Sequence, residues 1–359
     1  MPSWNDLGTA FNTLRELDVT AIREESERPL TIFCLGPRHL YTAVVEMLRP
    51  QGSRRYGPAG RDPFVHQPLP PGEPGDELRR ADLLLVLLDG REPVATSTSE
   101  ALSRLSNLVL PTVILICGRA APGDLGEPRP QFAHAHIAVL PDPGAPEALD
   151  HLASAIFERL PAELHLAAAR AVPGLRPAYA HELVSSVSFT NASYALASAL
   201  PQQIPILAVP FATADLVVLT KNQSLMVYRL ALAYGAPPEF QARMAEITPV
   251  IGGAFAWRQL ARTLVGLIPV WGVVPKVAVS YAGTYTTGIA ALRWFADGEV
   301  LPRERLKVIA EEAMRVGRER ATALVAAARE QSTRAGQRLK LPWAGKGKPS
   351  PGDKPAPKQ

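Results

Sequence analysis

The first half of the chain alternates short apolar runs with segments whose apolar residues recur at helical spacing. Four runs have the length and composition of buried strands, and three amphipathic stretches separate or follow them. The expected strands are residues 28–35, 81–88, 112–117 and 137–140, and the expected helices are residues 39–48, 99–108 and 145–160. Because parallel strands need long crossover connections, this alternation predicts an α/β fold with a mostly parallel sheet and helices on both faces.

Between the first two expected strands, residues 50–75 are rich in proline and glycine. Proline carries no backbone N–H, so it cannot donate to the ladder of a sheet. Seven prolines fall within this stretch, which is more than a strand can accommodate. We therefore expect a long irregular loop without a strand.

From residue 161 onward the apolar residues recur at helical spacing, and no strand pattern is evident. The helices expected there are residues 162–171, 177–200, 215–235, 240–267, 275–295 and 302–339, and a further amphipathic helix is expected at residues 5–23. The predicted organisation is an N-terminal helix (1–27), an α/β domain (28–160), a helical domain (161–338) and a tail (339–359). The Pro/Gly/Lys composition of the tail predicts disorder.

The third of these later helices is apolar except for one compact group of polar residues. Asp215, Asn222 and Arg229 recur every seven residues and fall on nearly one stripe, with Lys221 and Gln223 beside it. A helix this apolar buries most of its circumference. Either the stripe faces water on an amphipathic core helix, or it contacts a partner or another domain. The second interpretation makes these five residues the candidate interface.

Three segments of the helical part carry a resemblance to a known family. They read VPFATADLVVLTKNQSLMVYRLALAYG, ITPVIGGAFAWRQLARTLVGLIPVWG and KVAVSYAGTYTTGIAALRWFADG, in this order within residues 205–298. The stretch resembles the YcjF-like helical domain of unknown function, found at the C-terminus of bacterial Era-like GTPases and related proteins. The resemblance implies a helical architecture and a GTPase-like neighbour. It supplies no catalytic residues, because none are established for the family.

If the neighbouring domain is GTPase-like, as the resemblance implies, its phosphate loop should follow the first strand. That loop reads G-x-x-x-x-G-K-[ST]; its N–H groups and lysine bind phosphate, and its hydroxyl holds Mg²⁺. The aligned residues here are Gly36-Pro37-Arg38-His39-Leu40-Tyr41-Thr42-Ala43. Gly36 fits the pattern. Tyr41 replaces the second glycine, Thr42 the lysine and Ala43 the hydroxyl residue.

The other nucleotide-binding motifs are also missing. The N-K-x-D motif that reads guanine would follow residues 112–117, but the chain has Gly118-Arg119-Ala120-Ala121 there, without a carboxylate. No clear D-x-x-G motif is present. We therefore expect a degenerate P-loop GTPase-like domain without catalytic residues, and we expect neither GTP nor Mg²⁺ as a cofactor. The alternative is a noncanonical GTP-binding protein that uses Gly36, Arg38, His39 and Thr42.

A second question concerns residues 263–292, in which Lys276 is the single charged residue. Pro269 and Pro275 interrupt this run, and the longest uncharged helix left is shorter than the roughly 20 residues that span a bilayer. Residues 264–295 therefore form either a helical hairpin in a core or one that enters or leans on a membrane. For residues 269–298 we expect a packed hairpin that presents an apolar edge to a membrane or a partner.

Composition narrows the class of protein. The formal net charge of +4 is small, and much of the basic excess lies in the tail, at Arg338, Lys340, Lys346, Lys348, Lys354 and Lys358 against Asp353. Nucleic-acid binding, which needs a basic face on a folded element, is not expected. Weak attraction to anionic lipid is compatible with this tail. Cys34 and Cys117 lie in apolar runs, which favours buried free thiols in a reducing compartment.

Two further site types are not expected. No apolar signal segment is evident near the start of the chain, so we expect no export. His134 and His136 alternate as strand residues do, but no third ligand lies near them in sequence, so we expect no metal site.

These patterns favour a cytoplasmic bacterial protein that regulates or scaffolds without catalysis. It would act on a partner protein or at the inner face of the membrane, and its oligomeric state stays open. One alternative is a noncanonical GTPase, which bound nucleotide would reveal. The other is an integral multi-pass membrane component, which carbonate or high salt would fail to extract.

Overall fold

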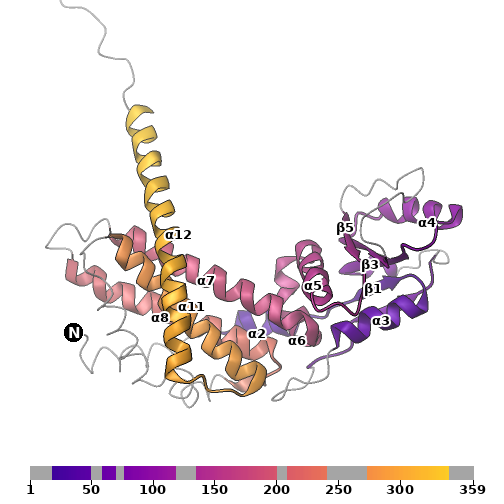
Figure 1. The fold of residues 1–359 in the computed structure, drawn as a ribbon, viewed down its shortest axis with the longest axis horizontal. Coiled ribbons are helices and arrows are strands. Elements are labelled where there is room, and N and C mark those ends of the chain that lie inside the picture. The colour runs from indigo at the N-terminus through magenta and orange to yellow at the C-terminus, as the bar shows by residue number, and fades with distance from the viewer. Residues whose placement is uncertain are drawn as a thin grey trace, which may run out of the picture.

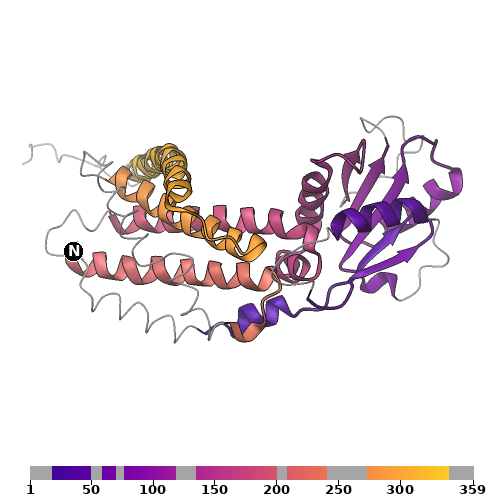
Figure 2. The same ribbon diagram turned by 60° about the horizontal axis from the view of Figure 1, so that its bottom comes forward.

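The computed structural model describes residues 18–49, 59–69, 77–118, 135–199, 208–240 and 273–338. Figures 1 and 2 show the sheet with its covering helices at one end of an elongated molecule. Long helices run away from the sheet, and the last of them crosses the others.

Five strands form one parallel sheet in the described part of the chain. They are β1 (Ile32–Leu35), β2 (Phe64–Gln67), β3 (Leu83–Asp89), β4 (Thr112–Cys117) and β5 (Ala135–Leu140), in the spatial order β2-β1-β3-β4-β5. In register, Ile32 lies opposite Leu83, and Leu84 lies opposite Thr112. β1, β3 and β4 are buried almost throughout, because both faces of the sheet are covered. The predicted α/β fold with a mostly parallel sheet is confirmed.

β2 shows that the expectation of no strand within residues 50–75 was wrong. It pairs with β1, and Phe64 lies opposite Ile32. Residues 64–67 contain no proline, and Pro63 takes part as an acceptor, since its carbonyl oxygen accepts the N–H of Ile32 at 2.8 Å. Of the described strands, β2 lies at one edge of the sheet, where a short strand tolerates prolines on either side. A high proline count over a long stretch concealed a four-residue strand.

Helices cover the sheet on both faces. α3 (Arg38–Leu48) and α5 (Ala148–Arg159) pack on one face, and α4 (Thr96–Ser106) packs on the other. α3 buries Leu40, Val44, Val45 and Leu48, which recur at helical spacing. The three helices agree with the helical patterns expected at residues 39–48, 99–108 and 145–160.

Beyond residue 161 each described element is helical. The elements are η2 (Ala162–Leu164), α6 (His165–Ala171), η3 (Pro173–Leu175), α7 (Arg176–Ala199), α8 (Ala208–Ala233), η6 (Pro238–Phe240), α11 (Val273–Asp297) and α12 (Arg303–Arg338). α6, α7, α11 and α12 match the expected ranges closely. α8 begins earlier than residue 215, and Gly235, with φ +92°, follows its end.

α11 lies at the centre of these helices, packed between α7, α8 and α12. Val277, Ala278 and Ala282 are fully buried. Of its side chains from residue 274 to residue 292, none is exposed. The described part of the expected hairpin therefore packs against other helices, and the expectation that residues 269–298 present an apolar edge to a membrane or a partner stays a prediction. Of the helices that the structure describes, none is both long enough and apolar enough to cross a membrane.

Two arginines join separate segments of the helical part to one another. Arg176, 1% exposed at the start of α7, donates to the carbonyl oxygens of Ala169 and Arg170. The side chain of Arg170 donates in turn to the carbonyl oxygens of Leu232 and Ala236, both at 2.8 Å. Carbonyls at the end of α8 lack helical partners, so these bonds cap it. Burial lowers the pKa of Arg176 to about 10.

The sheet and the long helices share one hydrophobic core. The cluster that contains Leu85 of β3 and Leu152 of α5 continues through Leu166 of α6 to Val184 of α7 and Leu292 of α11. The predicted domain boundary at residues 160 and 161 falls between α5 and η2. The two parts therefore meet through packed apolar side chains as well as through the chain itself.

Several expectations lie outside the described residues. α2 (Thr20–Ser26) is described, but the rest of the expected N-terminal helix, through residue 17, is not. The helix expected at residues 240–267, His134, and the tail at residues 339–359 also lie outside.

Candidate functional site

The carboxyl edge of the sheet is the first candidate site. α3 follows β1 onto one face of the sheet, and α4 follows β3 onto the other, so the direction of winding reverses between β1 and β3. In open α/β sheets, ligands bind outside the carboxyl ends of the strands at this reversal. Gly36 follows β1 and Asp89 ends β3. The candidate phosphate-loop residues therefore lie where the fold favours a ligand.

The turn after β1 offers few groups that could bind phosphate. A Cβ atom on Gly36 would lie 2.5 Å from the carbonyl oxygen of Leu87, so glycine permits the close approach of the turn to β3. Pro37 precedes the first residue of α3 and has no N–H to donate. The hydroxyl of Thr42 donates to the carbonyl oxygen of Arg38, one turn earlier, at 3.0 Å. Thr42 thus bonds within its own helix.

A histidine and a carboxylate bridge the reversal point. Nε2 of His39, in the first turn of α3, lies 3.8 Å from Oδ2 of Asp89. The other oxygen of Asp89 accepts the backbone N–H of Arg91 at 3.0 Å. His39 is largely exposed, so the pair contributes little to stability. Its effect on a ligand is larger, because the carboxylate would repel a phosphate bound at the start of α3.

β2 contributes a residue to this turn that sequence analysis missed. Nε2 of His66 lies 3.0 Å from the carbonyl oxygen of Gly36, and since a carbonyl only accepts, this nitrogen carries the hydrogen. The imidazole packs on the ring of Tyr41, with 4.5 Å between ring centroids. Burial raises the pKa of Tyr41. Because β2 was expected to be loop, no sequence signal placed His66 here.

At the end of β4, Gly118 lies next to Arg91, a residue that follows β3. Gly118 has φ +82°, and a Cβ atom there would lie 2.8 Å from Nε of Arg91. The guanidinium therefore lies against the backbone of Gly118. Among the residues that the structure describes, no group of three His, Cys, Asp or Glu side chains could hold a metal ion.

The polar stripe of α8 forms a second candidate site, and part of it faces other helices. Nδ2 of Asn222 donates to Oδ1 of Asn191 in α7 at 2.7 Å. Nε2 of Gln223 donates to the hydroxyl of Thr284 in α11 at 3.1 Å. Asn191 and Thr284 also bond each other at 2.9 Å, and both are fully buried. The amides of Asn222 and Gln223 thus join a three-helix hydrogen-bond network.

The other members of the stripe differ in their surroundings. Nη1 of Arg229 lies 2.7 Å from Oε1 of Glu25 in α2, and both side chains are largely buried. Lys221 is exposed. Asp215 lies in α8, but its side chain is outside the described part. Asn222, Gln223 and Arg229 therefore contact three different elements of the same chain, and a role of the stripe toward a partner protein stays a prediction.

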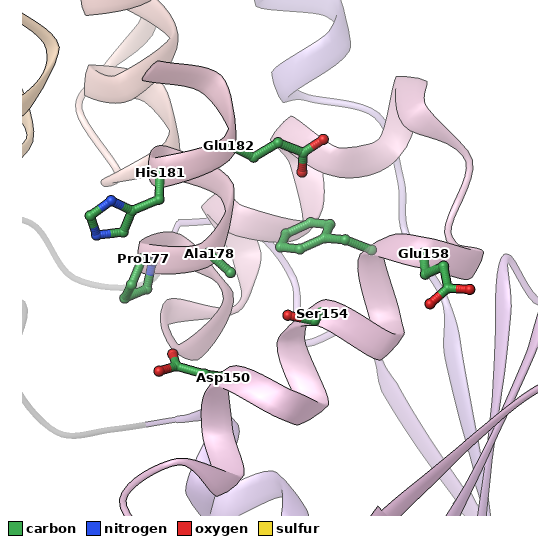
Figure 3. Close-up of a pocket in the computed structure, with 8 residues that line it drawn as sticks. Asp150, Ser154, Glu158, Pro177, Ala178, His181 and Glu182 are labelled. Atoms are coloured by element: carbon green, nitrogen blue, oxygen red, sulfur yellow. The ribbon is translucent and has the colours of Figure 1, made fainter. Parts of the chain in front are cut away.

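A groove between α5 and α7, with a volume of about 690 Å³, is a third candidate site (Figure 3). It is lined by Asp150, Ser154, Phe157 and Glu158 from α5 and by Pro177, Ala178, His181 and Glu182 from α7. Sequence analysis missed this groove, because its two walls come from helices assigned to different domains. Only their packing brings the carboxylates together.

Comparisons with known proteins add no assignment. None of the protein-family models compared with the chain matches it, and no curated protein does. The resemblance to the YcjF-like helical domain therefore rests on the three quoted segments alone.

Proposed function

We propose that the chain is a non-catalytic, GTPase-like regulator or scaffold that works by binding. In this proposal residues 28–160 are a degenerate GTPase-like domain, and residues 161–338 are a helical YcjF-like domain. The protein acts on a partner protein or at the inner face of a bacterial membrane.

The observation that carries the proposal is the chemistry at the carboxyl edge of the sheet. The fold has a ligand-binding reversal point, but the polar groups there are engaged within the chain. Thr42 bonds to Arg38, Asp89 lies beside His39, and Arg91 lies against Gly118. A site for nucleoside triphosphate needs a cationic side chain for the phosphates and oxygen ligands for Mg²⁺. Arg38 is an exposed cation at the start of α3, but no lysine stands at position 42, and Thr42 and Asp89 already bond within the chain.

Titration of the full chain with fluorescent GTP and GDP analogues, with and without Mg²⁺, tests the proposal. We expect no saturable binding. A Mg²⁺-dependent dissociation constant of about 1 μM or tighter would instead favour a noncanonical GTPase.

A loop-restoring variant tests the GTPase-like ancestry. Tyr41→Gly, Thr42→Lys and Ala43→Ser together rebuild the phosphate-loop pattern in place. A gain of Mg²⁺-dependent GDP binding, with an unchanged circular dichroism spectrum, would support a GTPase-like architecture. A folded variant that gains no binding would count against it.

A further inference from the structure

We propose that the groove between α5 and α7 receives residues 339–348 from the tail of a second copy of this chain. The inference does not depend on the proposed function, since it concerns self-association and not nucleotide binding.

The groove carries one available carboxylate on each wall. Within the described residues, neither Asp150 of α5 nor Glu182 of α7 forms an ion pair. Glu158 is already paired, because its carboxylate lies 2.9 Å from Nδ1 of His136. Figure 3 shows Asp150 and Glu182 on the two different helices that form the groove.

Besides the carboxylates, the lining combines apolar side chains of both helices with the polar side chains of Ser154 and His181. Phe157 is 8% exposed, and its ring packs against His165 with 4.8 Å between centroids. Pro177 and Ala178 continue this surface on α7. A ligand that fits these walls has an aromatic or aliphatic centre flanked by positive charges, since carboxylates attract cations and the face of an aromatic ring accepts them.

Residues 339–348 of the chain have this chemistry. They read LKLPWAGKGK, so that Trp343 and two leucines lie among Lys340, Lys346 and Lys348 with no acidic residue. These residues lie outside the described part of the chain. Their charge is complementary to that of the groove, and their indole is of a size that such a groove can bury.

The position of α12 favours a second copy as the source of this segment. α12 has 36 residues, which corresponds to about 54 Å of helix. Figure 1 shows that it extends past α11, and both views place it toward the end of the molecule opposite the sheet (Figures 1 and 2). The ten residues that follow it extend at most about 35 Å. A second copy can bring its tail to the groove, and reciprocal exchange would form a symmetric dimer.

Charge reversal tests the proposal with the full chain. One variant reverses the groove (Asp150→Lys and Glu182→Lys), and another reverses the segment (Lys340→Glu, Lys346→Glu and Lys348→Glu). Sedimentation velocity over a concentration series at low salt measures self-association. We expect the unaltered protein to self-associate and each variant to do so at least about ten-fold more weakly, as like charges then face each other.

Mixing the two variants tests directly whether the groove of one molecule binds the segment of another. In the mixture, the reversed groove of one variant faces the reversed segment of the other, and the unaltered groove faces the unaltered segment. Opposite charges then meet at both contacts, so association between the two proteins should return. A control variant with Glu92→Lys and Glu100→Lys has the same change in net charge as the groove variant, but on another surface. It should associate as the unaltered protein does. Circular dichroism checks that each variant is folded.

Three results would overturn the proposal. The first is an unaltered protein that stays monomeric across the series, and the second is a mixture that fails to recover association. The third is a tail variant that loses association while the groove variant keeps it, which would place the segment elsewhere. Docking of the segment within one chain would also give no recovery on mixing, because recovery requires two molecules.

Discussion

Asn191 is fully buried, yet both polar atoms of its side chain form hydrogen bonds. Its amide nitrogen donates to Thr284, its side-chain oxygen accepts from Asn222, and its main-chain carbonyl oxygen accepts from Ser280 at 3.0 Å. A buried polar group left without a partner costs about 1–3 kcal/mol. The network therefore disfavours packings of α7, α8 and α11 in which these side chains do not meet.

Asn222→Ala distinguishes an internal role of the α8 stripe from an interface role. The substitution removes the donor to Asn191, so we expect the free energy of unfolding to fall by about 1 kcal/mol. Urea unfolding measures the change. Lys221→Ala is the matched control, because Lys221 is its exposed neighbour and should change stability little. If Asn222→Ala leaves stability unchanged but weakens binding to a partner, the interface interpretation is correct.

The two cysteines should be unreactive in the folded protein. Burial raises the pKa of the Cys34 thiol to about 12, and burial together with nearby Asp89 raises that of Cys117 to about 11. The reactive form is the thiolate. At pH 8 we expect an aromatic disulfide reagent to label both thiols only as fast as the protein unfolds. Fast labelling without denaturant would show that one of these strands opens locally.

The same pKa shifts have a consequence for stability at high pH. Both thiol pKa values lie above the ordinary thiol value of 9.0, so the folded state holds these protons more tightly than the unfolded state. Their contribution is complete below about pH 9 and is lost as the pH rises through 11 to 12. Replacing both cysteines by alanine should therefore flatten the fall of the unfolding free energy above pH 9. An unchanged slope would contradict the expectation.

At the scale of elements, the approach of α11 to its neighbours depends on small residues. A Cβ atom on Gly288 would lie 2.6 Å from both methyl groups of Val184 in α7. A Cβ atom on Gly317 of α12 would lie 3.0 Å from the carbonyl oxygen of Ala278. The low-charge sequence of α11 is thus explained by enclosure among three helices that approach closely.

Gly288→Ala should destabilise by overpacking, by about 1–3 kcal/mol. Val184→Ala removes the two methyl groups that the new side chain would meet, and by itself leaves a cavity. We expect the double variant to be less destabilised than the sum of the single changes by at least about 1 kcal/mol, measured by urea unfolding. Simple additivity would show that the helices move apart instead.

At the scale of the whole molecule, the shared core joins the sheet to the long helices. Apolar contacts continue from β3 through α6 into α7 and α11. The Arg229–Glu25 pair also holds α2, just ahead of β1, against α8. This arrangement leaves little room for the two parts to move as independent bodies.

Hydrogen exchange tests whether the two parts unfold together. We expect the slowest amides of β4 and of α11 to exchange with the same free energy, because losing one part exposes the shared core of the other. The end of α12 should exchange much faster, since it extends beyond α11. Protection that survives in α11 after β4 has opened would show two independent units.

Most elements could be predicted from the sequence, because their patterns are local. Residues 113–117 are apolar throughout, as is typical of a strand covered on both faces, and α4 carries its apolar residues at helical spacing. The missing phosphate-loop lysine and hydroxyl are also evident from residue identity alone. β2 was missed because a four-residue edge strand next to prolines carries little local signal.

Only the tertiary structure decided how the polar residues are used. The spacing of Asn222 and Arg229 predicts that they share one stripe of a helix. It does not determine whether that stripe faces water or a neighbouring helix. Their partners, Asn191 and Glu25, lie 31 and 204 positions away. The same holds for α11, because its low charge fits a membrane and a core equally well, and only the structure shows that it packs against α7, α8 and α12. Local pattern determines which face of an element is apolar, whereas contacts between distant segments determine what that face meets.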